Sequence, residues 1–182
     1  RLPDVRLSDP TLLGWHGGLV LASSVVSGRG WRIDLWSSPD GVGWSRLGHL
    51  QARPTGRLRG CAFTEGRIAA TEDRILAVAS CVPYENGTIG GSAVAGVDGS
   101  AQRATSGANL WAWTSVDGRR WSRHLVTEEL DPAGAAQHAV VMRSIGSGFA
   151  AVMCCYPPRL WWSDDGAHWR EVSTLPDTVA YQ

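Results

Sequence analysis

Acidic side chains are the first candidates for chemistry, because two carboxyl groups that flank one bond perform acid–base catalysis in glycoside hydrolysis. The neighbouring acids of the 182-residue chain include the pairs Glu72-Asp73 and Glu128-Glu129. Neighbouring residues of an extended chain point to opposite faces, so neither pair can act together on one bond. We interpret both pairs as solvated loop charges and predict no catalytic residue.

Histidine and cysteine are the next candidates, since they are common metal ligands. The five histidines are scattered without metal-ligand spacing, and no Cys-x-x-Cys pair occurs, so we predict no metal site and no cofactor. The even number of cysteines favours disulfide bonds in an exported protein, with free thiols in a reducing compartment as the alternative. Three pairings remain open, and strain disfavours a bond between the neighbours Cys154 and Cys155. The candidates are Cys61, Cys81, Cys154 and Cys155.

Aromatic side chains are the third candidates, because indole faces stack on the C–H surfaces of sugars. The chain has 10 tryptophans, and six of them belong to a repeated pattern. Trp31 opens a predicted strand, where we expect it to pack. The candidates for an exposed ligand-binding surface are Trp15, Trp111, Trp162 and Tyr84. Burial is the alternative for these tryptophans, since Trp is highly buried on average.

One short phrase, Ser-x-Asp-Gly-x-x-Trp, is written three times in the chain. Asp-Gly between extended segments is a strong hairpin signal, because Asp caps backbone N–H groups and Gly accepts positive φ. The final Trp returns over the turn as the next strand begins. The residues are Ser38, Asp40, Gly41 and Trp44, then Ser115, Asp117, Gly118 and Trp121, then Ser163, Asp165, Gly166 and Trp169. We predict that these residues form structural turns.

The phrase resembles the Asp-box, or BNR repeat, of sialidases, sortilin-type receptors and many secreted bacterial proteins. In that family the box is the turn between the third and fourth strands of a β-propeller blade, usually on the rim away from the ligand site. A further Trp lies four residues before each box Asp, at Trp36, Trp113 and Trp161. The resemblance therefore covers nearly the whole chain and implies an all-β propeller fold.

Extended segments surround each box and predict three units of four strands each. The second strand of each unit is small and apolar, as expected for strands buried on both faces. We expect three four-stranded antiparallel blades at about residues 8–50, 61–127 and 138–175, with an insertion at 84–106. The predicted strands are 11–15, 19–25, 31–37 and 44–47; 67–70, 75–82, 109–115 and 121–126; and 139–144, 149–156, 159–163 and 169–172.

Composition restricts the partners. The 17 basic residues balance 17 acidic ones, which argues against nucleic acid or an anionic membrane as the main partner. No apolar run is long enough for a membrane-spanning helix. Every basic residue is Arg, which is typical of high-GC coding sequence. We expect a secreted or cell-surface protein of a high-GC bacterium.

The sialidase resemblance does not extend to catalytic residues. Sialidases use an arginine triad, a Tyr nucleophile activated by Glu and an Asp acid/base, and they carry an Arg-Ile-Pro phrase. The nearest string here, Arg32-Ile33-Asp34, lacks the proline. We therefore expect a non-enzymatic binding or scaffold module for a glycan or a partner protein. The alternatives are a part of a sialidase-like glycoside hydrolase and a purely structural subunit of an extracellular assembly.

Three blades are fewer than the four to eight that close a propeller ring. An open set of blades leaves apolar faces and strand edges uncovered. We therefore expect a homo-oligomer, such as a dimer with six blades, or a complex with further blades from another chain.

Overall fold

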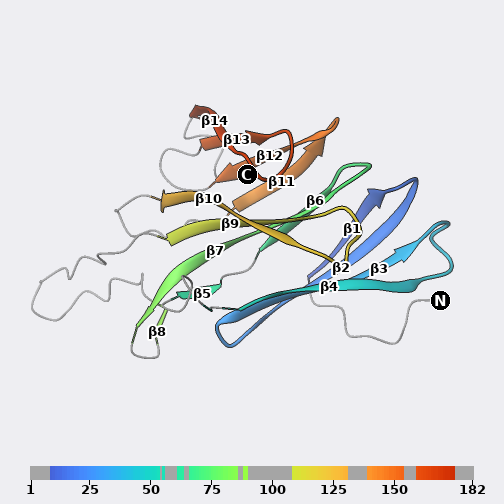
Figure 1. Cartoon of the computed structure of the whole chain (residues 1–182), viewed down its shortest axis with the longest axis horizontal. Coiled ribbons are helices and arrows are strands. Elements are labelled where there is room, and N and C mark those ends of the chain that lie inside the picture. The colour runs from blue at the N-terminus through green and yellow to red at the C-terminus, as the bar shows by residue number, and fades with distance from the viewer. Residues whose placement is uncertain are drawn as a thin grey trace, which may run out of the picture.

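The computed structural model describes residues 9–53, 55, 61–63, 66–85, 88–89, 108–130, 139–153 and 159–174. The described residues form strands and turns without any helix, arranged in three antiparallel sheets (Figure 1). None of them belongs to a helix that could cross a membrane. Each sheet corresponds to one predicted blade, and we name the sheets blades 1, 2 and 3 in chain order.

Blade 1 is a meander in which each strand pairs with the next along the chain. It comprises β1 (Pro10–Trp15), β2 (Gly18–Ser27), β3 (Gly30–Ser38) and β4 (Ser45–Ala52). A bulge between Leu35 and Trp36 leaves Leu47 as the extra residue on β4. The observed strands match the predicted ones, with β4 running further than expected.

Blade 2 also has four strand positions, but its inner position is divided between two short strands. The strands are β5 (Cys61–Phe63), β6 (Arg67–Ala70), β7 (Ile75–Glu85), β8 (Thr88–Ile89), β9 (Ala108–Ser115) and β10 (Ser122–Leu130). Both β5 and β6 pair along β7, with a register change of one residue between them. Neither β5 nor β8 was predicted. Most of the expected insertion at 84–106 lies outside the described residues.

Blade 3 repeats the meander of blade 1. Its strands are β11 (Ala139–Ile145), β12 (Gly148–Met153), β13 (Arg159–Ser163) and β14 (Arg170–Thr174). The bulge between Leu160 and Trp161 recurs opposite β14, where Val172 takes the place that Leu47 has in blade 1. In blades 1 and 3 the extra residue stands three positions after the box Trp, whereas in blade 2 the first register shift of β10 comes later, between Leu125 and Thr127.

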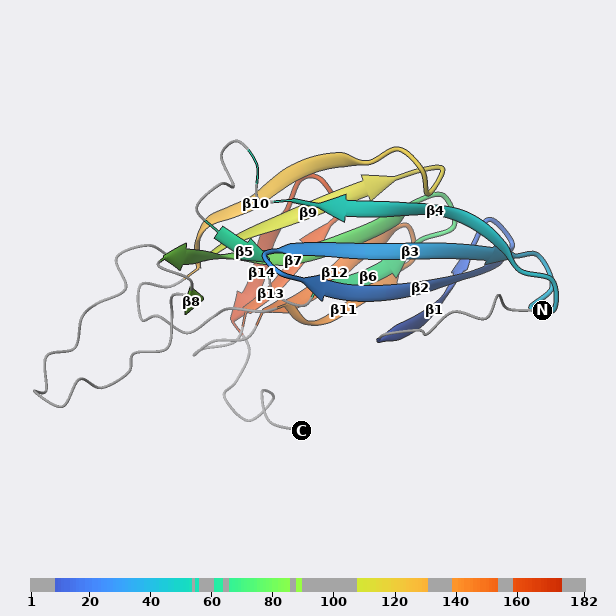
Figure 2. The same cartoon turned by 90° about the horizontal axis from the view of Figure 1, so that it is seen from below.

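Blade 2 lies between the other two blades, and the apolar core is divided into two layers on its two faces (Figure 1; from below in Figure 2). Between blades 1 and 2, Ile33 and Leu35 pack with Ala77 and Trp113. Between blades 2 and 3, Leu76 and Val78 of β7 join Met142 and Phe149. Because neighbouring residues of β7 enter different layers, this strand is buried on both faces, as its apolar run predicts.

The inner strands β1, β6 and β11 lie side by side, with β6 in contact with both of the others. The last strands, β4, β10 and β14, form the outer edges of the sheets. Blades therefore present their first strands to a common centre and their box turns away from it. The predicted arrangement of four-stranded antiparallel blades is confirmed.

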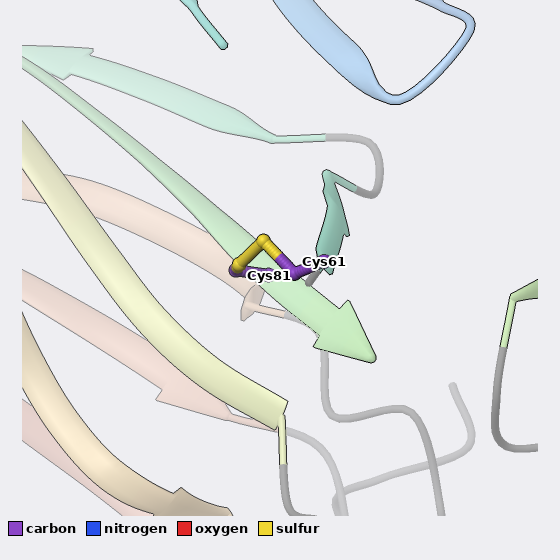
Figure 3. The surroundings of a disulfide bond; sticks show 2 residues. All are labelled: Cys61 and Cys81. Carbon is purple, nitrogen blue, oxygen red and sulfur yellow. A yellow bond between two sulfur atoms is a disulfide. The ribbon is translucent and has the colours of Figure 1, made fainter. Parts of the chain in front are cut away.

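A disulfide bond joins Cys61 of β5 to Cys81 of β7, whose Cα atoms lie 5.5 Å apart (Figure 3). The sequence predicted disulfide bonds without fixing their pairing, and this bond settles one pair. It attaches the short strand β5 to the long strand beside it. Cys154 and Cys155 lie outside the described residues.

Candidate functional site

The three box turns share one hydrogen-bond pattern. Each Ser Oγ accepts a hydrogen bond of 2.8 Å from the box Gly N–H and donates one to the box Asp. One oxygen of each Asp accepts hydrogen bonds of 2.8–3.0 Å from the backbone N–H groups two and three residues later. Each box Gly has positive φ, between 68° and 79°. The carboxylates are therefore occupied within their own turns.

These hydrogen bonds also set the protonation of the box carboxylates. Backbone N–H groups of Val42 and Gly43, with the Ser38 hydroxyl, hold the pKa of Asp40 below its usual range. In the third box, burial by itself raises the pKa of Asp165. Hydrogen bonds from the backbone and side chain of His168 outweigh that effect, so the pKa of Asp165 lies well below its usual range. These groups are anionic turn caps at neutral pH, which is not the state of a general acid.

The second and third boxes hold the blades together. Arg119, next to the second box Gly, donates from Nε to the Leu47 carbonyl of blade 1 at 3.0 Å. Arg74 of blade 2 donates from Nη1 to the Asp165 carbonyl of blade 3 at 2.6 Å. Gly118 and Gly166 are both buried. Each of these boxes therefore docks onto the blade that precedes it in the chain.

The box tryptophans fold back over their turns. The indole Nε1 donates 3.0 Å hydrogen bonds from Trp44 to the Gly41 carbonyl and from Trp169 to the Gly166 carbonyl. All three box tryptophans, including Trp121, are half-buried. Trp44 and Trp169 thereby fix their turns, whereas Trp121 Nε1 is buried without a hydrogen-bond partner among the described residues.

The proposed aromatic surface needs a correction. Trp15 and Trp111 are each only 8% exposed and belong to the layer between blades 1 and 2. Trp111 lies two residues before Trp113, so both indoles point from the same face of β9 into that layer. Their ring faces are therefore not open to a ligand. Trp162 is half-buried, and its Nε1 donates to Asp164 at 2.8 Å. Tyr84 lies in β7, and its side chain is outside the described part.

A different set of side chains surrounds a pocket at the inner strands. The pocket has a volume of about 250 Å³ and receives residues from all three blades. Blade 1 contributes Thr11 from β1, blade 2 contributes Arg67 from β6, and blade 3 contributes Arg143 from β11. Pockets where a few polar groups converge on an apolar wall are the usual form of small-molecule sites.

The floor of this pocket is formed by buried side chains. The indole of Trp31 is fully buried there and donates a 2.7 Å hydrogen bond from Nε1 to Ser24 Oγ. Ile68 and Met142 complete the buried wall. Because these groups belong to the packed layers between blades, the position of the polar rim is set by the fold.

The rim carries two guanidinium groups and one carboxylate. Arg67 Nη1 lies 3.8 Å from Asp9 Oδ2 and 3.4 Å from the Gly66 carbonyl. Arg143 Nη1 donates to the Met142 carbonyl at 2.9 Å. Asp9 has a φ of 45°, a left-handed conformation that is uncommon outside glycine. Both arginines have more N–H groups than these bonds use, so they can donate hydrogen bonds into the pocket.

A second hollow lies between blades 2 and 3, near the third box. Its residues include Arg74, His124 and Asp165. His124 Nε2 lies 3.3 Å from Thr114 Oγ1, and burial lowers the pKa of His124 below its usual value. This hollow is more open than the inner pocket and borders the turn that joins the blades. In its lining, Arg74 and Asp165 belong to the contact between blades 2 and 3, and Ser115 and Asp117 close the second box turn.

The remaining candidates are the pairs of neighbouring acids and the metal-binding residue types. Glu72 and Asp73 are exposed in the hairpin between β6 and β7, as expected for solvated charges. Glu128 and Glu129 lie in β10, with side chains outside the described part. Among the described residues, no three His, Cys, Asp or Glu side chains come close enough to bind a metal ion.

No protein-family model and no curated protein sequence matches the chain. Solved structures do match its fold. The Penicillium chrysogenum α-L-arabinanase, solved with arabinobiose, aligns over 92% of this chain and 50% of its own, with a TM-score of 0.52 and 16% identity.

Two further structures give the same result. The Bombyx mori β-fructofuranosidase aligns over 93% of this chain and 35% of its own, with a TM-score of 0.54 and 12% identity. A glycosyl hydrolase from Bacteroides ovatus aligns over 92% and 49%, with a TM-score of 0.51 and 12% identity. These neighbours are β-propeller glycosidases, and the chain spans about half of their length or less. The chain therefore has the fold of a partial β-propeller.

Proposed function

We propose that this chain is the carbohydrate-binding part of a β-propeller related in fold to glycoside hydrolases, and that it belongs among the Asp-box proteins. The observation that carries the proposal is the inner pocket, where Thr11, Arg67 and Arg143 converge from three blades. The shared hydrogen bonds of the three boxes support the Asp-box assignment. The solved propellers support a carbohydrate ligand by analogy of fold.

The chemistry of the pocket suits a sugar ring. Guanidinium N–H groups donate to hydroxyl oxygens in fixed directions, and the Thr11 hydroxyl both donates and accepts. The side chains of Ile68 and Val141 supply apolar surface beside them. A volume of about 250 Å³ is small for a ligand pocket, so we propose that it holds one ring of a glycan.

The number of carboxyl groups around the inner pocket favours a binding function over hydrolysis. Hydrolysis of a glycosidic bond uses two carboxyl groups, one on each side of the bond. Among the described residues around the inner pocket, Asp9 is the single carboxylate. If the assembled protein is a glycosidase, a second acid must come from outside this set. That arrangement would be the alternative in which the chain is part of a hydrolase.

We also propose that the protein is secreted or exposed at the cell surface. The Cys61–Cys81 bond supports this location, because disulfide bonds persist mainly in oxidising compartments. Glycans accessible to such a protein would be extracellular.

Glycan-array binding by the native chain, followed by titration calorimetry on the best glycan, tests the proposal. Arg67→Ala and Arg143→Ala should each weaken binding at least about tenfold, since each removes charged hydrogen-bond donors worth roughly 1.5–3 kcal/mol. Arg159→Ala is the matched control, because Arg159 is exposed and pairs with Glu171 on the outer side of blade 3.

Reducing-sugar release from the bound glycan separates the two alternatives. Binding without release supports a binding module, and release supports the hydrolase alternative. Absence of binding to any glycan would refute the proposal. So would equal affinities for the two pocket variants and the wild type.

A further inference from the structure

Blades dock through one repeated contact, in which the box Gly of a blade sits on the preceding blade. A methyl group built on Gly118 would lie 2.5 Å from Leu47 Cδ2 of blade 1. One built on Gly166 would lie 2.7 Å from Thr114 Cγ2 of blade 2. In both contacts a box turn meets the preceding blade, at the fourth strand β4 in blade 1 and at the third strand β9 in blade 2.

The chain carries one box turn that is not used in this way. Gly41 of blade 1 is half-buried, whereas Gly118 and Gly166 are buried. Among the described residues, only Leu19 of the same blade comes within 4 Å of a methyl group built on Gly41. The first box therefore has the conformation of the other two but lacks a described blade beneath it.

Blade 3 carries the matching surface without a box on it. Val172 has the position of Leu47, and Trp162 has the position of Thr114, one residue before the box Ser. Val172 is 53% exposed, and Trp162 is half-buried. We call these two side chains the blade 3 seat.

The whole face of blade 3 around this seat is open. Ile145 of β11 is 58% exposed and Val141 is 41% exposed. On blade 2 the corresponding face, with Ala69 and Leu76, is buried under blade 3. Exposed apolar side chains that gather on one sheet face mark an interaction surface.

We propose that the blade 3 seat binds the first box turn of a second copy of this chain. Within the described residues each chain has one unused box and one unused seat, so two copies can satisfy each other. A contact of this head-to-tail type closes a ring when the rotation fits, and two copies would give six blades. Leu12, on the open face of blade 1, would then be covered by blade 3 of the partner.

This proposal can be tested separately from the carbohydrate function, because the substituted residues Val172 and Leu12 do not line the inner pocket, although Val141 of the same open face does. Light scattering after size-exclusion chromatography tests it on the native chain. We expect a species of twice the chain mass of 19.5 kDa. Val172→Asp and Leu12→Asp should each raise the dimer dissociation constant about 100-fold or more, because an unpaired carboxylate is costly to bury.

Val116→Asp is the matched control, since Val116 is a similarly exposed valine in the second box turn, away from the seat. It should leave the dimer intact, and circular dichroism should show the same sheet content in all variants. A wild-type chain that stays at 19.5 kDa up to high concentration would overturn the proposal, as would a Val172→Asp protein that dimerises like the wild type. If the chain instead completes its ring with blades from another protein, the wild-type chain alone would stay at 19.5 kDa.

Discussion

Substituting Gly118 by Ala should test whether box glycines hold blades together. Gly118 has a φ of 68°, which an alanine adopts at a cost of about 1–2 kcal/mol. The added methyl would also lie 2.5 Å and 2.8 Å from two carbon atoms of Leu47. Overpacking of this kind costs about 1–3 kcal/mol, so the free energy of unfolding should fall by about 2–5 kcal/mol.

Gly146→Ala is the matched control for backbone strain. Gly146 has a φ of 59°, and no described atom lies within 4 Å of a methyl group built there. Only the conformational cost of about 1–2 kcal/mol should remain. Urea unfolding followed by tryptophan fluorescence gives both values. In a Leu47→Ala background the extra cost of Gly118→Ala should largely vanish. Equal losses for Gly118→Ala and Gly146→Ala, within about 0.5 kcal/mol, would refute the contact between box and blade.

Three other predictions concern stability. Reduction of the Cys61–Cys81 bond, which closes a loop of 20 residues, should cost about 3 kcal/mol and lower the melting temperature; an unchanged melting temperature would contradict it. The pKa of Asp165 is lowered, so the stabilising effect of its carboxylate is complete above about pH 4 and is lost as the pH falls further. In Asp165→Asn the midpoint of acid unfolding should therefore move to a higher pH. The lowered pKa of His124 predicts a second loss of folding stability, which begins as the pH falls below about 6.5. This fall in melting temperature should be absent when His124→Gln is measured over the same pH series.

The strands could be predicted from the sequence because the box fixes their register. Once Ser38, Ser115 and Ser163 are aligned, the upstream Trp falls two residues before the Ser in each unit, and a small apolar second strand precedes it at a distance that varies. The short strand β5 could not be found in this way. Its three residues have no alternation of their own, and pairing with β7 and the bond to Cys81 define it.

Tryptophan exposure was harder to predict, because it depends on which blade covers which face. Trp111 shares a face with Trp113 by the period of two, so its burial could have been inferred from the sequence. Trp162 follows Trp161 directly and points to the opposite face, where blade 3 has no described neighbour. Trp15 ends β1 and packs between blades, which no local pattern indicated.

The inner pocket was missed for a different reason. Thr11, Arg67 and Arg143 are separated by more than 50 residues along the chain and share no motif. They come together because first strands converge at the centre of a propeller. Within β11 the apolar Met142 is followed by the charged Arg143, and this alternation indicates one buried and one open face of the strand.

The repeated and the unrepeated residues of the blades have separate tasks. Each box uses its Ser and Asp to close a turn, and the second and third turns also contact the preceding blade. Such a contact must recur in every blade, so its residues recur as well. The inner strands need only small or apolar residues on the faces between blades, which leaves the inward positions free to differ. A threonine and two arginines occupy the pocket rim, and no repeat constrains them. Recognition is therefore to be sought where the three blades differ, at the centre, and stability where they agree, at the box turns.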